Sequence, residues 1–208
     1  MVNKQFVLLG PPGSGKGTQA KILAERLGVT HISTGDIFRD HIARQTDLGV
    51  KAKKILEAGI FMPDDITNAL IKEKLAQPDA KNGFILDGYP RNLVQANFLF
   101  HLMPEIKTIY ISLSDEEVIK RISGRRISKS TGAIYHLQYN PPPVDIDPAD
   151  IIQRSDEKEE VVKERLEIYH QAIEPLLEFY RNQHQLITID GSPPINDVTK
   201  TIIKLINA

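Results

Sequence analysis

A glycine-rich loop near the N-terminus limits the possible folds of this 208-residue chain more than any other feature. The loop runs from Gly10 to Thr18 and contains four glycines and Lys16. It follows the short apolar run 5–9 and precedes residues 19–27, whose apolar side chains recur at helical spacing. A buried strand, a glycine-rich loop and a helix in this order are typical of a phosphate-binding loop.

The chemistry of the loop suits the phosphates of a nucleoside triphosphate. Glycine lets the backbone turn its N–H groups inward, and the N-terminus of the helix adds partial positive charge. Lys16 adds a full positive charge for the β- and γ-phosphates. Gly17 stands where such loops usually carry Ser or Thr, and the hydroxyl follows at Thr18. We therefore expect Mg²⁺ to be held through water and the triphosphate; a turn with a solvated lysine is the alternative to a phosphate site.

Composition narrows the class of protein further. With 41% hydrophobic residues, 25% charged residues and a net charge of −1, the chain resembles ordinary globular proteins and has no general charge attraction to nucleic acid or anionic membranes. No apolar run approaches the roughly 20 residues of a membrane-spanning helix, and we expect no signal peptide before the first strand. The absence of cysteine excludes disulfides and thiolate metal sites and favours a reducing, cytoplasmic location.

Hydrophobic periodicity predicts an α/β fold. The segments expected to form strands are 5–9, 29–32, 84–86, 108–111 and 186–190. Because helical patterns alternate with them, we expect a five-stranded parallel sheet with helices on both faces. Two segments depart from this alternation: residues 33–62, interpreted as a flap, and residues 124–157, interpreted as a lid with one small hairpin strand. The core would then consist of residues 1–32, 63–123 and 158–208.

Candidate site residues follow the second expected strand. Either Ser33 or Thr34 can cap the next helix. Thr34 can instead face a ligand, and Arg39 is long enough to pair with a phosphate. Taken alone, the segment favours a helix cap and a surface arginine.

A second candidate segment follows the third expected strand, at the carboxyl end where open α/β sheets bind ligands. Asp87 is placed to orient the water shell of Mg²⁺, and Gly88 and Pro90 form a tight turn that aims Arg91. Gln95, one helical turn later, can point into the same cleft. An ordinary strand-to-helix turn is the alternative.

Four further arginines lie on or near expected helices. We expect the helix after the fourth strand to extend through Arg126, so that Arg121 and Arg125 face the same way. That pair fits a bound anion and a solvated basic helix end equally well. A later long helix is expected to open at Arg154 and to place Arg165 on the same face three turns on, with Pro175 kinking or restarting it.

These cations point to phosphoryl transfer. No nucleophile and base are paired near them in the sequence, and the transition state of phosphoryl transfer needs positioning and positive charge more than covalent chemistry. Closure of the flap and lid would keep water away from the triphosphate.

Over its whole length the chain resembles the adenylate kinases, which are nucleoside monophosphate kinases. The motifs that carry the resemblance are Gly-Pro-Pro-Gly-Ser-Gly-Lys-Gly-Thr-Gln at 10–19, Ser-Thr-Gly-Asp at 33–36 with Arg39, Asp-Gly-Tyr-Pro-Arg at 87–91 with Gln95, Gly-Arg-Arg at 124–126, Tyr-His at 135–136 and Arg-Ser-Asp-Glu at 154–157. The Lys-Gly-Thr order, unusual among phosphate-binding loops in general, is typical of this family.

The resemblance implies the Mg²⁺-dependent reaction ATP + AMP ⇌ 2 ADP, which serves adenine nucleotide homeostasis, in a monomer whose partners are these nucleotides. The ATP side would comprise Gly13, Ser14, Gly15, Lys16, Gly17, Thr18, Arg121, Arg125, Ile134, Tyr135 and Pro193. The AMP side would comprise Thr34, Gly35, Arg39, Ile60, Phe61, Met62, Gly88, Tyr89, Pro90, Arg91, Gln95, Arg154 and Arg165. The catalytic cations would be Lys16, Arg91, Arg121, Arg125, Arg154 and Arg165. Asp36 and Asp87 would order the water around Mg²⁺.

The chain departs from the family pattern in two places. Tyr89 stands where the family often has Phe, a change that we expect to be harmless. Some bacterial relatives hold a metal with four lid ligands, whereas this lid has no cysteine and is shortened between Asn140 and Arg154, so we expect no structural zinc.

Other nucleotide-binding proteins share part of these motifs. A UMP/CMP kinase or a GTP:AMP kinase would share nearly all of them; Thr34 favours AMP as the acceptor, and the donor base stays open between ATP and GTP. A nucleotide-dependent switch protein would need a guanine-reading Asn-Lys-x-Asp motif, which the sequence lacks, and would have no use for the arginine set.

Overall fold

The computed structural model describes residues 4–57, 62–154, 157 and 159–206. Its central sheet has five strands in the order β2-β3-β1-β4-β8, and every neighbouring pair is parallel. The strands are β1 (Gln5–Leu9), β2 (Thr30–Ser33), β3 (Phe84–Asp87), β4 (Lys107–Ser112) and β8 (Leu186–Asp190). The predicted α/β class, strand number and parallel sheet are confirmed, with strand ends shifted by a residue or so.

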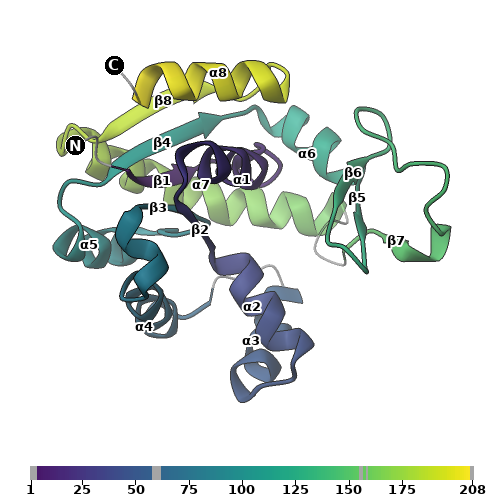
Figure 1. Ribbon diagram of the computed structural model, residues 1–208, viewed down its shortest axis with the longest axis horizontal. Coiled ribbons are helices and arrows are strands. Elements are labelled where there is room, and N and C mark those ends of the chain that lie inside the picture. The colour runs from purple at the N-terminus through teal and green to yellow at the C-terminus, as the bar shows by residue number, and fades with distance from the viewer. Residues whose placement is uncertain (1–3, 58–61, 155–156, 158, 207–208) are drawn as a thin grey trace.

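Helices cover both faces of the sheet (Figure 1). Because side chains alternate along a strand, Phe6 and Leu8 pack on one face with α1 (Lys16–Leu27) and α8 (Ile195–Ile206). Val7 and Leu9 point to the other face. The helices there are α4 (Asp64–Leu75), α5 (Leu93–Leu102) and α7 (Glu159–Asn182). The 3₁₀ turn η1 (Pro78–Asn82) leads into β3.

Two groups of elements project from this core (Figure 1). The helices α2 (Thr34–Ala43) and α3 (Asp47–Glu57) share a small core around Phe38 and Ala52. Beyond α6 (Asp115–Ser123) lies an antiparallel sheet of three strands in the order β6-β5-β7. Its elements are β5 (Arg125–Ser128), β6 (Ile134–His136) and β7 (Ile151–Ile152), with the 3₁₀ turn η2 (Pro148–Asp150) before β7.

The predicted course of the chain around Arg125 is wrong. Helix α6 ends at Ser123, and Arg125 begins β5, so Arg121 and Arg125 do not share a helix face. Gly124 follows the helix and leaves room for His136, because a Cβ there would lie 2.3 Å from Nε2 of that ring.

The predicted start of the last long helix is also wrong. Arg154 lies outside the helix, which begins at Glu159, so the expectation that Arg154 and Arg165 share one helix face fails. The same helix continues through Pro175 to Asn182 as one element, so it does not restart at the proline.

Candidate active site

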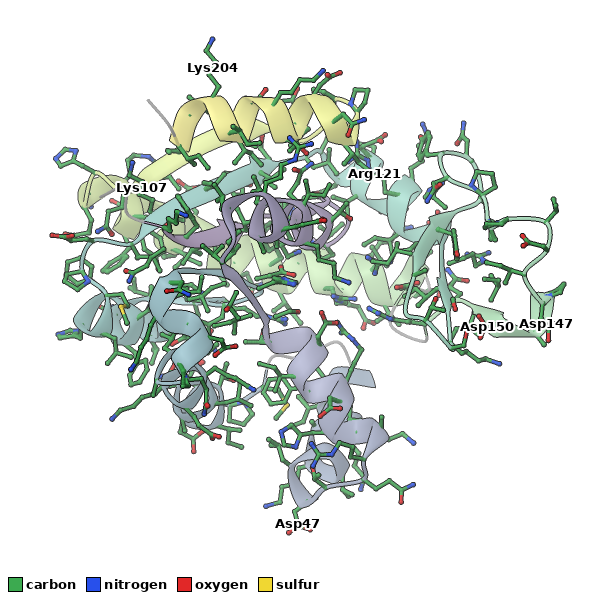
Figure 2. The ribbon with its side chains drawn as sticks, viewed as in Figure 1. Asp47, Lys107, Arg121, Asp147, Asp150 and Lys204 are labelled. Atoms are coloured by element: carbon green, nitrogen blue, oxygen red, sulfur yellow. The ribbon has the colours of Figure 1, made fainter. Side chains whose placement is uncertain are left out.

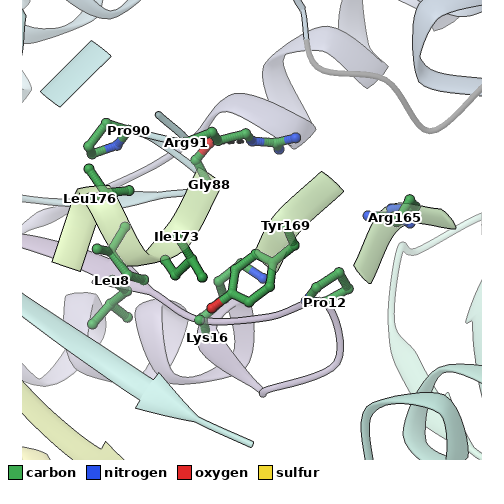
Figure 3. Close-up of a pocket in the computed structure, with 12 residues that line it drawn as sticks. Leu8, Pro12, Lys16, Gly88, Pro90, Arg91, Arg165, Tyr169, Ile173 and Leu176 are labelled. Carbon is green, nitrogen blue, oxygen red and sulfur yellow. Dashed lines mark hydrogen bonds between the residues drawn. The ribbon is translucent and has the colours of Figure 1, made fainter. Parts of the chain in front are cut away.

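A cleft of about 80 Å³ lies at the carboxyl ends of β1 and β3. The glycine-rich loop and the Gly88–Arg91 turn form two of its sides, and α7 forms a third (Figure 3). Lys16, Arg91 and Arg165 all line it, although they are far apart in the sequence. The structure thus brings three of the predicted cations together at the predicted edge of the sheet.

The glycine-rich loop lets α1 begin at the cleft. Gly15 adopts φ +86° at the N-cap, a left-handed conformation that favours glycine, and the helix begins at Lys16 with Thr18 in its first turn. The first backbone N–H groups of a helix have no intrahelical acceptor, so they are available to an anion. The hydroxyl of Ser14 is buried and has no hydrogen-bond partner in the described part of the chain. Gly13 is also left-handed, with Ile122 next to the position of a Cβ.

Lys16 has an unusual electrostatic environment. Its ammonium group donates to the Pro11 carbonyl at 3.1 Å. Burial lowers the pKa of Lys16 to about 8; Asp87 opposes this shift, and the charges of Arg91, Arg165 and Arg125 add to it. The site therefore concentrates positive charge, which a polyphosphate would compensate.

Asp87 ends β3 beside the loop. A Cβ at Gly17 would lie only 3.1 Å from its Oδ2, so glycine at this position leaves room for the carboxylate. Nε2 of His31 lies 3.6 Å from the same oxygen. Sequence reasoning missed His31, because only the pairing of Ser33 with Asp87 in the parallel register places His31 on the same side of the sheet.

The turn after Asp87 joins two predicted residues at one carbonyl group. Gly88 adopts φ +75°, and its carbonyl oxygen accepts from the Thr34 hydroxyl at 2.9 Å and from Nε of Arg91 at 2.7 Å. A Cβ at Gly88 would lie 3.1 Å from the Thr34 hydroxyl, so this close approach, together with the positive φ, favours glycine. Pro90 follows Tyr89 through a cis peptide bond and lines the cleft.

Gln95 is buried behind this turn, with 1% of its surface exposed. Its Oε1 accepts from the backbone N–H of Arg91 at 2.8 Å, and its Nε2 donates to Oδ1 of Asp64 at 2.7 Å. Asn92 also donates to that oxygen, at 2.9 Å. Asp64 was not predicted as a site residue; the only signal in the sequence was its position directly after Pro63, in the first turn of a predicted helix.

Tyr89 is fully buried in the main core. Burial and the charge of Asp64 raise the pKa of Tyr89, so its hydroxyl stays protonated. The hydroxyl donates to Oδ1 of Asn68 at 2.6 Å and lies 3.3 Å from the backbone carbonyl oxygen of Gln95. Tyr89 therefore packs in the core against the segment that carries Gln95, and its side chain does not line the cleft.

The start of α2 settles one open alternative. The side chain of Ser33 accepts from the backbone N–H of Asp36 at 3.2 Å, so Ser33 is the helix cap and Thr34 is free of that role. Arg39 forms an ion pair with Asp36 at 2.5 Å and packs over Gly35. Burial raises the pKa of Asp36, but the hydrogen bond and charge of Arg39 outweigh it and leave the pKa lowered.

Arg121 connects α6 to the turn after β8. Its Nε donates to Glu117 at 2.9 Å, and its two terminal nitrogens donate to the carbonyl oxygens of Gly191 and Ser192 at 3.0 and 3.1 Å. These contacts hold the guanidinium beside Pro193, the residue predicted to contact the ATP base.

Arg125 is anchored by a carboxylate that sequence reasoning did not assign. Glu157 has no exposed surface, and its Oε1 lies 2.6 Å from Nη2 and 2.8 Å from Nε of Arg125. The backbone N–H of Arg154 donates to the other oxygen at 3.4 Å. The Arg-Ser-Asp-Glu motif contained this glutamate, but only the fold shows its partner.

The remaining predicted residues lie farther from the cleft. Ile134 and Tyr135 are on β6, and Met62 is buried with Phe38 in the small core of α2 and α3. Ile60 and Phe61 lie outside the described residues. In the described ranges no cluster of three or more His, Asp or Glu side chains could hold a metal ion, and no described helix is long and apolar enough to cross a membrane.

Comparison with known proteins decides the family. The family model for adenylate kinase matches residues 8–185. The chain belongs to the adenylate kinase family. Adenylate kinases of Fusobacterium nucleatum, Caldicellulosiruptor saccharolyticus and Methanocella arvoryzae are 46%, 45% and 46% identical to it. The matches cover 99%, 96% and 95% of this chain and 100%, 97% and 96% of the three relatives. Members of this family are phosphotransferases that convert ATP and AMP to two ADP, and the predicted enzyme class is confirmed.

Proposed function

We propose that the cleft transfers the γ-phosphoryl group of ATP to AMP with Lys16, Arg91 and Arg165 as its central cations. The observation that supports this most directly is their convergence from the glycine-rich loop, the turn after β3 and α7. As the γ-phosphoryl group moves between two oxygens, negative charge spreads over its three remaining oxygens. Three cations that line one cleft would stabilise that charge without large reorganisation during the reaction.

The residues near the loop also fit magnesium. Mg²⁺ prefers oxygen ligands and keeps most of its water, and the Asp87 carboxylate beside Gly17 is an acceptor for such water. Bound Mg²⁺ would neutralise phosphate charge. The buried hydroxyl of Ser14, which has no partner among the described residues, and the first N–H groups of α1 would hold the β-phosphate. Asp36, which is paired with Arg39, would also order water around Mg²⁺, but from a position farther from the loop.

The acceptor side of the cleft, defined here as Thr34, Gly88, Arg91 and Gln95, would bind AMP. Arg91 would hold the AMP phosphate, together with Arg39, Arg154 and Arg165. Gln95 and Thr34 would contact the base, with the backbone of residues 60–62 beside it. The shared contact of Thr34 and Arg91 with the Gly88 carbonyl supports this, because it fixes the two predicted contact residues relative to one another.

The donor side, defined here as Arg121, Arg125 and Glu157, would bind ATP. Arg121 and the Pro193 carbonyl would flank the base, with Ile134 and Tyr135 on the other side. Arg125 would hold a phosphate, and its charge already acts on Lys16. We further propose that residues 33–62 act as the AMP-binding flap and 124–157 as the lid over the core, and that the enzyme is a cytoplasmic monomer without structural zinc.

The test is ADP formation from ATP and Mg²⁺ with AMP, CMP, UMP or GMP as the acceptor. We expect turnover with AMP, and loss of at least about 10²-fold in kcat for Lys16→Ala. Arg44→Ala is the matched control, because Arg44 is an exposed arginine paired with Asp40. Faster turnover with CMP or UMP than with AMP would contradict the acceptor assignment, and full activity of Lys16→Ala would contradict the assignment of the cleft.

A further inference from the structure

The amide of Gln95 is held in one orientation by two partners of opposite kind. A carboxylate can only accept hydrogen bonds, and a backbone N–H can only donate one. Asp64 accepts from Nε2 at 2.7 Å, and Arg91 N–H donates to Oε1 at 2.8 Å. A flipped amide would set oxygen against carboxylate and N–H against N–H. Since Gln95 is 1% exposed, water does not readily replace either partner.

The orientation of Asp64 is itself fixed. The oxygen that accepts from Gln95 also accepts from Nδ2 of Asn92 at 2.9 Å. The other end of the Asn92 amide accepts from the backbone N–H of Gln95 at 3.0 Å, as the cap of α5. The direction of each hydrogen bond in this network is therefore set by a group that can act in only one way.

This network uses only half of the hydrogen-bonding capacity of the Gln95 amide. A glutamine amide has two hydrogens and two lone pairs, and among the hydrogen bonds of the described residues one of each remains unused. Buried polar groups are rarely left incomplete. The unused pair can complete its bonds with a base that places a donor next to an acceptor, in an order fixed by the network.

We propose that Asp64 is a positioning residue that sets the base specificity of the acceptor site by fixing the Gln95 amide. This rests on the proposed function, in which Gln95 contacts the acceptor base. A 6-aminopurine offers an amino donor to Oε1 and a ring-nitrogen acceptor to Nε2. A 6-oxopurine places an oxygen where the amino group would be, so it meets Oε1 with like polarity unless the amide flips.

The test compares AMP with IMP, the 6-oxo analogue, as acceptors at saturating ATP. Asp64→Ala removes the acceptor for Nε2, and we expect the AMP-over-IMP ratio of kcat/KM to fall by about tenfold or more. The change should appear in the KM of the acceptor and leave the KM of ATP in place. Asp64→Asn keeps a neutral carbonyl oxygen and should retain most of the discrimination. Asp65→Ala, an exposed neighbour in the same first turn, should behave as wild type.

The outcomes separate the two proposals. An unchanged AMP-over-IMP ratio in folded Asp64→Ala would overturn the role of Asp64, whereas absence of AMP turnover in the wild type would overturn the proposed function itself. If Asp64→Ala does not fold, NMR of the wild-type chain decides. A through-hydrogen-bond coupling between Nε2 of Gln95 and the carboxyl carbon of Asp64 is expected, and a resolved Gln95 amide without it would overturn the proposal.

Discussion

On the acceptor side of the cleft, Thr34 and Arg91 meet at one backbone carbonyl, and Gln95 lies between a backbone N–H and a carboxylate. On the donor side, Arg121 and Arg125 each pair with a glutamate. The acceptor contacts meet at Gly88, one residue after a core strand. The donor contacts connect α6, β5 and the segment before α7. The acceptor contacts therefore lie next to the central sheet, whereas the donor contacts join elements at the edge of the core through ion pairs.

The small sheet of β5, β6 and β7, beyond the donor side, is also held by a carboxylate. Asp150 accepts from the hydroxyl groups of Ser128 and Ser130 and from the backbone N–H of Ser130. Figure 2 shows Asp147 and Asp150 at the end of the β5–β7 sheet that lies away from Arg121 and the core. Exposed polar bonds of this kind contribute less to global stability than apolar burial does.

The largest expected effect is on the acceptor side. Arg91→Ala removes a cation from the cleft and one of the two donors to the Gly88 carbonyl, and should lower kcat for AMP phosphorylation by about 10²- to 10³-fold. Steady-state kinetics measures it, with Arg44→Ala as the control. A drop of only a few-fold would mean that the acceptor side does not position the transferred group.

A large effect on stability is expected on the donor side. Glu157→Gln leaves the Arg125 guanidinium without its buried counter-charge and should lower the free energy of unfolding by about 3 kcal/mol. Urea denaturation measures it. Glu159→Gln, which removes only an exposed pair with Lys163, is the control and should change little. Equal stability of the two variants would contradict this prediction, because the donor side would then not depend on its ion pair.

A moderate gain in stability is expected from replacing Lys16, which lies in the cleft between the two sides. Its pKa of about 8 in the folded chain lies below the usual 10.5, so between these pH values the unfolded chain binds more protons and wild-type stability rises with pH. Below pH 8 the buried charge costs stability in full. Lys16→Met should therefore raise the free energy of unfolding at pH 7 by about 1–2 kcal/mol while abolishing activity.

Denaturation series from pH 7 to 10 would check this effect at Lys16. The Met variant should lose the rise that the wild type shows above pH 8. Lys21→Met, an exposed lysine on the same helix, is the control and should keep the rise. A destabilised Lys16→Met variant would show that Lys16 supports the fold of the loop and not only its chemistry.

The smallest effect is expected at Tyr89. Tyr89→Phe removes the hydroxyl that bonds Asn68, and should lower the free energy of unfolding by about 1 kcal/mol with little change in kcat. Thermal unfolding compared with that of Tyr139→Phe, whose ring is half-exposed, would check it. A larger loss of AMP affinity than of stability would show that the hydroxyl acts on the Gln95 segment directly.

Much of this architecture could be predicted from local patterns. The loop before Lys16 and the strand that ends at Asp87 have signals within about ten residues, and the structure places them as expected. The sequence left the next helix cap open between Ser33 and Thr34, and the structure places it at Ser33. The predictions at Arg125 and Arg154 failed because spacing along a helix was assumed across Gly124 and across the segment before Glu159.

Partners that come from distant segments could not be predicted at all. Asp64 meets Gln95 and Glu157 meets Arg125 across about 30 residues of chain, and His31 meets Asp87 only through strand register. No periodicity reports such contacts, because each depends on how whole elements pack. The cations of the site were therefore predictable, whereas the groups that hold them in place were not.

The most direct test of phosphoryl transfer between two bound nucleotides starts from ADP alone. With ADP, Mg²⁺ and the wild-type chain, ³¹P NMR should show ATP and AMP appearing in equal amounts with no inorganic phosphate, because two nucleotides occupy one cleft that excludes water. Arg91→Ala should produce the same products far more slowly. Accumulation of inorganic phosphate, or AMP without matching ATP, would contradict transfer between two bound nucleotides.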